Sequence, residues 1–83
     1  MTFLRIEYFN QNQYRWSAVY ETAVSNLEKA KARFFKMKEM KIIENPDGTV
    51  TRNTFIRLVM SEKSCGRKHD YYKLLKIMEV RNI

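Results

Sequence analysis

The stretch SNLEKAKARFFKMKEMK, residues 25–41, decides how the rest of the chain is interpreted. Its first four residues have the form of a capping box, in which the Ser25 hydroxyl accepts a hydrogen bond from the Glu28 amide and the Glu28 carboxylate accepts one from the Ser25 amide. Ser25 is therefore predicted to be the N-cap of a helix that runs to about Met40. One apolar stripe recurs along it at helical spacing, formed by Leu27, Ala30, Phe34 and Met37.

Positive charge is concentrated in the same stretch. Residues 29–41 hold six basic residues against one acidic residue, Glu39, which is +5 of the formal net charge of +7. Three of the basic residues share a face beside the apolar stripe: Lys29, Arg33 and Lys36. The helix is thus predicted to bury one face and to present positive charge on another.

The part of the chain before this helix has the alternation of a β-hairpin. Residues 3–9 place Leu4, Ile6 and Tyr8 on one face, and residues 14–22 alternate again after a polar connector at 10–13. In the second segment one face is predicted to hold Tyr14, Trp16, Ala18 and Tyr20, with Val19 as an apolar exception. Helical spacing also fits part of this segment, at Trp16, Tyr20, Ala23 and Leu27. The helix could therefore begin earlier, but the capping box favours a strand.

The clearest local turn signal is Asn45-Pro46-Asp47-Gly48. Proline presets φ for the second position of a type I turn, and glycine can adopt the left-handed conformation that follows it. Residues 41–44 and 49–60 are predicted to pair as antiparallel strands across this turn, the second being one long strand with room for a bulge near Asn53. A helix that starts at Asn53 is the competing interpretation.

Residues 61–68 are predicted to form a polar, basic loop before a second helix. That helix would start at His69 or Asp70 and end near Val80, and its apolar stripe would be formed by Tyr71, Leu74, Leu75 and Met78. The resulting order is strand, strand, helix, strand, strand, helix. It predicts a single α+β domain over 1–83, with a small antiparallel sheet and both helices on one face.

The residues needed for enzymatic chemistry are scarce. One cysteine and one histidine cannot supply the four ligands of a structural zinc site, and no glycine-rich phosphate loop is present, so no metal or cofactor is expected. Cys65 is predicted to be a buried thiol and His69 a residue at a helix start. A metal-independent ribonuclease is the remaining catalytic hypothesis, because RNA carries its own nucleophile. Its groups would be His69, Tyr71 or Tyr72, Arg67 and Lys68.

The chain is expected to work in the cytoplasm. The first residues show no apolar segment typical of a signal peptide, and no run approaches the roughly 20 apolar residues that span a bilayer. No membrane partner is therefore expected. Because a chain this short buries a modest core, a homo-oligomer is expected.

Nucleic acid is the partner that the charge favours. A second basic segment, 63–76, holds five basic residues against Asp70. RNA is preferred to DNA because aromatic rings can stack on unpaired bases; the rings available are Tyr8, Tyr14, Trp16, Tyr71 and Tyr72. The predicted binding residues are Lys29, Arg33, Lys36, Arg67, Lys68, Tyr72, Lys73 and Lys76. Solvated lysines on helix backs, and core or rim packing of Trp16 and Tyr20, are the simpler explanations.

The general style of the chain resembles the small early proteins of bacteriophages, among them anti-restriction, antitoxin-like and anti-CRISPR inhibitors. The resemblance lies in a short chain rich in Lys, Asn and Ile, with a capped helix after a hairpin and no catalytic set. It implies an alternative function, the blocking of a host defence or toxin protein in the host cytoplasm through an acidic or nucleic-acid-bound surface of that protein. No motif is specific to one family, so the resemblance assigns no residue a role.

Overall fold

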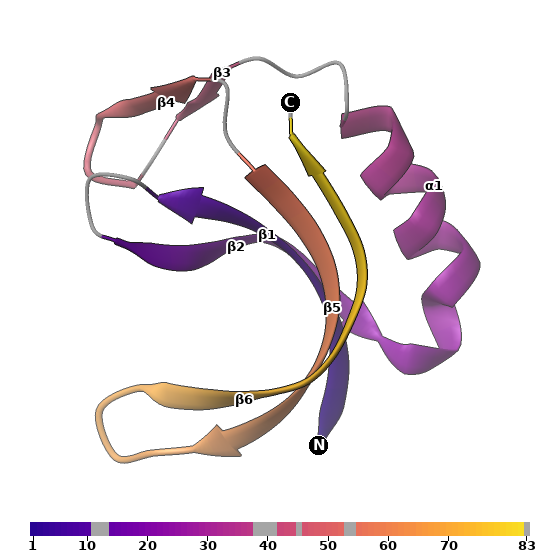
Figure 1. The fold of residues 1–83 in the computed structure, drawn as a ribbon. Helices are drawn as coiled ribbons and strands as arrows, with labels where there is room; N and C mark the ends of the chain where they lie inside the picture. Colours follow the sequence, from indigo (N-terminus) through magenta and orange to yellow (C-terminus); the bar gives the residue numbers. More distant parts are fainter. Residues whose placement is uncertain (11–13, 38–41, 45, 53–54, 83) are drawn as a thin grey trace.

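The computed structural model describes residues 1–10, 14–37, 42–44, 46–52 and 55–82. A four-stranded antiparallel sheet has the order β2-β1-β5-β6. Its strands are β1 (Thr2–Asn10), β2 (Arg15–Ala23), β5 (Phe55–Cys65) and β6 (Asp70–Asn82). A 3-10 helix, Val24–Asn26, leads into α1 (Leu27–Met37), and β3 (Ile42–Glu44) pairs with β4 (Val50–Arg52) in a separate small sheet. Figure 1 shows that β5 and β6 curve strongly, with α1 on the convex side.

The core lies between α1 and the two central strands. Alternate residues of β1 and β5 face the helix, and Ile6 pairs with Leu58 in the register. The cluster of buried residues consists of Leu4, Ile6, Tyr8, Ala30, Phe34, Met37, Ile56 and Leu58. The predicted α+β class and the inward face of the helix are confirmed, but the described residues contain one α-helix where two were expected.

The start of α1 differs from the capping-box prediction. Ser25 lies inside the 3-10 helix, whose N-cap is Ala23, and no side chain caps it. Instead, the Asn26 side-chain amide donates to the Thr22 hydroxyl at 2.8 Å, which ties the first turn to the end of β2. Ser25 is not the N-cap, because the chain already turns helical at Val24. The strand before the helix is nevertheless confirmed, and a helix that includes Trp16 and Tyr20 is excluded because both lie in β2.

The C-terminal end of α1 is at Met37, with Lys36 in its last turn. A cation there lies near the negative pole of the helix dipole, which is a favourable position. The prediction that the helix extends to Met40 falls on residues 38–41, which lie outside the described residues.

Val19 marks a β-bulge between β1 and β2. Ile6 pairs with Tyr20 and the next residue, Glu7, pairs with Ala18, so Val19 is the extra residue. A bulge reverses which face the following residues occupy. Trp16 and Tyr20 therefore lie on opposite faces of the sheet, and the prediction of one shared face is wrong.

The predicted turn is confirmed at Gly48, whose φ of +85° is in the left-handed region. The single long strand predicted over 49–60 is wrong, because β4 pairs with β3 and β5 belongs to the large sheet. The possible bulge near Asn53 lies outside the described residues. A helix that starts at Asn53 is excluded by β5.

The largest correction concerns the C-terminal third. The predicted loop over 61–68 is mostly strand, since β5 continues to Cys65, and the predicted second helix is β6. Two register shifts, between Leu58/Val59 and Met60/Ser61, insert extra residues into β6. They change the spacing of its apolar residues from two to three, which imitates the spacing of a helix.

Among the described residues, no helix has both the length and the apolar character needed to cross a membrane.

Candidate nucleic-acid interface

The predicted basic stripe on α1 is exposed. Lys29, Arg33 and Lys36 all reach solvent and form no ion pair with any residue that the structure describes. The Arg33 guanidinium lies 4.6 Å from the centroid of the Tyr20 ring on β2. This contact directs the stripe toward the β2 side of the sheet, where three cations at i, i+4 and i+7 can follow a phosphate backbone.

The other flank of α1 faces β6. Phe35 lies on that flank, and the Arg81 guanidinium of β6 is 5.0 Å from the centroid of its ring. Because Arg33 contacts β2 and Phe35 contacts β6, the basic stripe is turned away from β6.

The second predicted basic group lies at the β5–β6 turn and along β6. The Gly66 amide donates to the His69 carbonyl at 3.1 Å and closes the turn that carries Arg67 and Lys68. Both are exposed, and beside them the Tyr71 ring, 58 % exposed, lies 4.6 Å from the His69 ring. An exposed ring next to two cations is an arrangement that can stack on a base and hold its phosphate.

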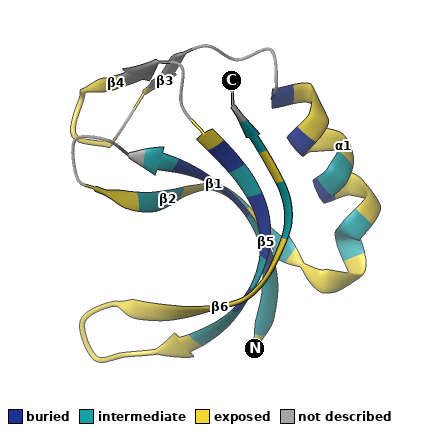
Figure 2. Ribbon diagram, in the orientation of Figure 1, coloured by how far each residue is buried: buried dark blue, intermediate teal, exposed yellow. Residues whose placement is uncertain are grey.

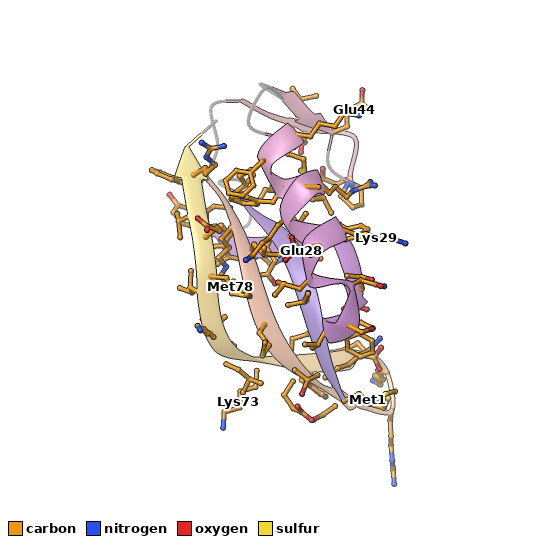
Figure 3. The ribbon with its side chains drawn as sticks, turned by 90° about the vertical axis from the view of Figure 1, so that its right-hand side faces the viewer. Met1, Glu28, Lys29, Glu44, Lys73 and Met78 are labelled. Atoms are coloured by element: carbon orange, nitrogen blue, oxygen red, sulfur yellow. The ribbon has the colours of Figure 1, made fainter. Side chains whose placement is uncertain are left out.

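Lys73 and Lys76 are exposed on the face of β6 that points to the α1 side, since their register partners are Glu62 and Met60. Figure 3, viewed from the α1 side, shows Lys73 at the lower end of β6 and Lys29 on the opposite flank of the helix. Lys73 and Lys76 therefore lie on the same side of the sheet as the α1 stripe, but across the helix from it.

Tyr72 does not belong with these lysines. Its register partner is Lys63 and its ring contacts Arg5, with 3.6 Å from the guanidinium carbon to the ring centroid. Tyr72 therefore lies on the other face of the sheet, which α1 does not cover. We call this the helix-free face, defined on the inner strands by Arg5, Glu7, Arg57 and Val59.

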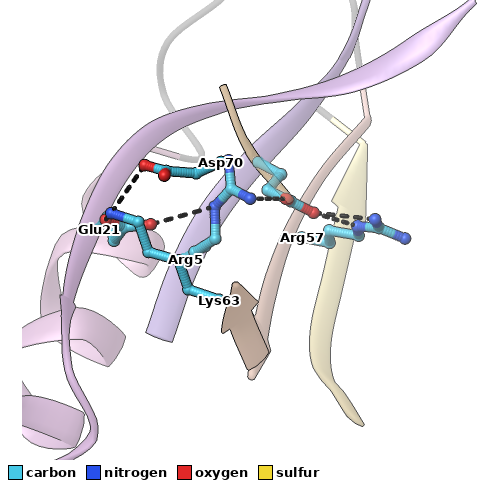
Figure 4. Close-up of polar contacts among 6 residues, drawn as sticks. Arg5, Glu21, Arg57, Lys63 and Asp70 are labelled. Carbon is cyan, nitrogen blue, oxygen red and sulfur yellow. Dashed lines mark hydrogen bonds and ion pairs between the residues drawn. The ribbon is translucent and has the colours of Figure 1, made fainter. Parts of the chain in front are cut away.

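The helix-free face carries a chain of ion pairs that sequence reasoning missed (Figure 4). Glu7 accepts from Arg57 at 2.8 Å and lies 3.5 Å from Arg5. Arg5 is 3.6 Å from Glu21, which is 3.6 Å from Lys63. The chain then ends at Asp70. Cations and carboxylates alternate along it in the order Arg57, Glu7, Arg5, Glu21, Lys63 and Asp70. The only sequence signal was the outward position of Arg5 and Glu7 on one strand.

Lys63 lies near two carboxylates of this network, those of Glu21 and Asp70. Its pKa is raised above the ordinary lysine value, chiefly by the hydrogen bond with Tyr72 and further by the carboxylates of Glu21 and Asp70. It is a firmly charged member of the network, so it is unsuited to act as a base.

Two aromatic rings line a groove in the helix-free face. The Arg57 guanidinium is 4.0 Å from the centroid of the Trp16 ring, and Tyr72 contacts Arg5 in the same way. The groove has a volume of about 530 Å³ and continues past Arg15 and Pro46. Trp16 thus packs against a cation outside the buried core, which agrees with rim packing and not with core packing.

The groups considered for catalysis lie near the β5–β6 turn. Cys65 is exposed, which contradicts the predicted buried thiol, and His69 lies in the turn before a strand, where a helix start was expected. No group of three or more possible metal ligands occurs among the described residues. The His69 and Tyr71 rings lie together, and the ribonuclease hypothesis is untested.

Comparison of the chain with protein-family models, with curated proteins and with solved structures found no match. The resemblance to small bacteriophage inhibitors therefore stays a hypothesis.

Proposed function

We propose that this protein binds nucleic acid, with RNA preferred to DNA, through the stripe of Lys29, Arg33 and Lys36 on α1. The observation that carries the proposal is a contrast between the two sides of the sheet. Arg5, Arg57 and Lys63 on the helix-free face are paired with carboxylates, whereas the cations of the stripe are exposed and unpaired within the described residues. Unpaired cations gain most from contact with phosphates, because binding then releases counterions.

The β5–β6 turn supplies a second contact. Arg67 and Lys68 would hold phosphates while Tyr71 stacks on an unpaired base, and Lys73 and Lys76 would extend the contact along β6. The preference for RNA rests on exposed rings, among them Tyr14 at 86 % and Tyr71. Stacking of this kind requires splayed, single-stranded bases, which RNA loops commonly present.

The test is the salt dependence of binding to a labelled single-stranded RNA, measured by fluorescence anisotropy. Replacing the stripe by Lys29→Gln, Arg33→Gln and Lys36→Gln removes three phosphate contacts. The slope of log K against log salt should become shallower by about 2, because each contact to a single strand contributes about 0.7. Affinity at low salt should fall by at least about tenfold.

Arg15→Gln is the matched control. Arg15 is exposed at the start of β2, by the groove of the helix-free face. The substitution therefore removes a positive charge that lies outside the stripe. Its salt slope should match that of the wild type. If the triple variant and Arg15→Gln weaken binding equally, or if neither weakens it, the stripe is not the binding surface. A DNA strand of the same sequence measures the preference for RNA.

A further inference from the structure

The helix-free face carries an exposed apolar strip along β6. The register places Leu74 opposite Ser61, Ile77 opposite Val59 and Val80 opposite Arg57, all on the side away from α1. Phe55 of β5 and Tyr72 complete the strip by the same alternation. We define the apolar strip as Phe55, Tyr72, Leu74, Ile77 and Val80, whose exposed fractions lie between 37 % and 54 %. Figure 2 shows the contrast between the mostly exposed β6 and the buried stretch of β5.

The size of the strip suits a protein interface. Five large apolar side chains, each about half exposed, present on the order of 400–500 Å² of apolar surface. A standard interface takes about 800 Å² from each partner, of which somewhat more than half is apolar. The area of the strip therefore matches the apolar area that one partner contributes to a stable interface.

The charge around the strip indicates which partner fits. The ion-pair chain from Arg57 to Asp70 has three cations and three carboxylates, so its charges cancel. The formal net charge of +7 therefore arises from residues outside this network. A nucleic acid would gain little electrostatic attraction from this face. A second copy of the chain would present the same balanced charge, so the two faces would repel each other least.

The shape of the face allows two copies to fit together. Pairing between β1 and β5 ends at Glu62, so the rest of the β5–β6 hairpin projects beyond β1 as an arm. Figure 1 shows this arm bending around the concave side of the sheet. One copy thus offers both a concave groove and a projecting arm, and a two-fold axis can place the Tyr72 and Leu74 face of each arm against the groove of the other copy, with the turn at Arg67 and Lys68 beyond the contact.

The edge of β6 is a poorer contact than its face. The two bulges in β6 interrupt the regular ladder that edge-to-edge pairing needs. We propose that two copies of this chain form a symmetric dimer through their helix-free faces, burying the apolar strip and leaving the α1 stripe accessible. This inference does not rest on nucleic-acid binding.

Sedimentation velocity of the full chain over a range of concentrations tests the dimer. Wild-type protein should sediment at twice the chain mass of 10.1 kDa as concentration rises. Val80→Glu should raise the dimer dissociation constant by at least about 100-fold, because an isologous interface contains each substitution twice and each copy costs about tenfold. Val80→Thr keeps a β-branched side chain, and a smaller increase is expected from it if the Glu variant does not fold.

Val24→Glu is the matched control, since Val24 is 36 % exposed in the 3-10 helix, outside the apolar strip, and receives the same change. It should dimerise as the wild type does. If the wild-type protein is a monomer at all concentrations, the proposal is overturned, and the apolar strip would then be a binding surface for a different protein. A dimer that Val80→Glu and Val80→Thr both leave intact also overturns it.

Discussion

Glu7 is the residue on which the helix-free face depends. It is one of two buried polar residues among those described, and its carboxylate lies between the guanidinium groups of Arg57 and Arg5. A buried carboxylate is tolerated only when cations and hydrogen bonds compensate its desolvation. Glu7 therefore holds two arginines at a place where they would otherwise repel each other.

Replacing this carboxylate should destabilise the fold. Glu7→Gln keeps the shape but leaves two largely buried guanidinium groups without their shared anion, and we expect the free energy of unfolding to fall by about 3 kcal/mol. Urea denaturation followed by circular dichroism measures it. Glu62→Gln removes a half-exposed carboxylate that pairs with the N-terminal ammonium, and its effect should be much smaller. Equal losses in both variants would contradict the role assigned to Glu7.

Glu62 itself gives a prediction about pH. The Thr2 hydroxyl, which donates to its carboxylate at 2.7 Å, lowers its pKa most, and the N-terminal ammonium lowers it further. A lowered pKa in the folded state means that the ionised group stabilises the protein above the ordinary value of 4.5. This contribution is lost as pH falls through the folded-state pKa.

Thr2→Val should raise the pKa of Glu62 toward its ordinary value, which an NMR titration of the carboxyl resonance measures. The pKa of Asp47, held low by the hydroxyl and amide of Thr49, should stay unchanged in the same spectra and serves as the internal control. If the pKa of Glu62 does not change in this variant, the Thr2 hydroxyl is not the main cause of the lowered pKa.

At the scale of elements, the β5–β6 arm depends on the absence of a side chain at Gly66. A Cβ there would overlap the His69 carbonyl oxygen and would lie 2.6 Å from the Tyr71 ring. The turn can close with its Gly66–His69 hydrogen bond only because glycine occupies this position. The exposed Tyr71 and the cations of the turn are therefore positioned by a close backbone approach.

Gly66→Ala should open the arm, with a loss of about 1–3 kcal/mol from crowding. Amide hydrogen exchange should accelerate over residues 63–72 and remain slow in β1. Gly48→Ala is the comparison, because nothing lies within 4 Å of a Cβ there and only its positive φ is strained. Its exchange changes should be confined to β3 and β4. Exchange that is unchanged in the arm of Gly66→Ala would show that the turn accommodates a side chain.

At the scale of the whole molecule, α1 divides the exposed positive charge into two groups. The stripe of Lys29, Arg33 and Lys36 faces β2, and the group at the turn and on β6 lies across the helix. The molecule is about 31 Å wide. A ligand must therefore extend over or around α1 to meet both groups.

This separation predicts a dependence on ligand length. One variant carries the three Gln substitutions of the α1 stripe, and the other carries Arg67→Gln and Lys68→Gln. With a long single-stranded RNA, their losses of binding free energy should add when the two variants are combined, since the sites are apart. An oligonucleotide much shorter than the molecule can contact only one group at a time. For it, the variant that combines both groups of substitutions should lose less binding free energy than the sum of the two separate losses. Anisotropy titrations with both lengths measure the difference, and identical behaviour would argue that the two groups form one site.

Local patterns in the sequence determined much of the N-terminal half. The alternation of Leu4, Ile6 and Tyr8, the helical spacing of Ala30 and Phe34, and the left-handed turn at Gly48 all appear in the fold. Each rests on contacts that repeat along one element, so a short window of sequence contains the information. The α1 stripe was predictable for the same reason.

Only the tertiary structure decided the C-terminal third and the helix-free face. Residues 70–82 carry apolar side chains at helical spacing, yet they become β6 because β5 supplies backbone partners along their length and bulges absorb the extra residues. In the same way, Glu7 meets Arg57 from 50 positions away only when β1 pairs with β5. Strand pairing brings distant parts of the chain together, and a local sequence pattern does not predict which strands will pair.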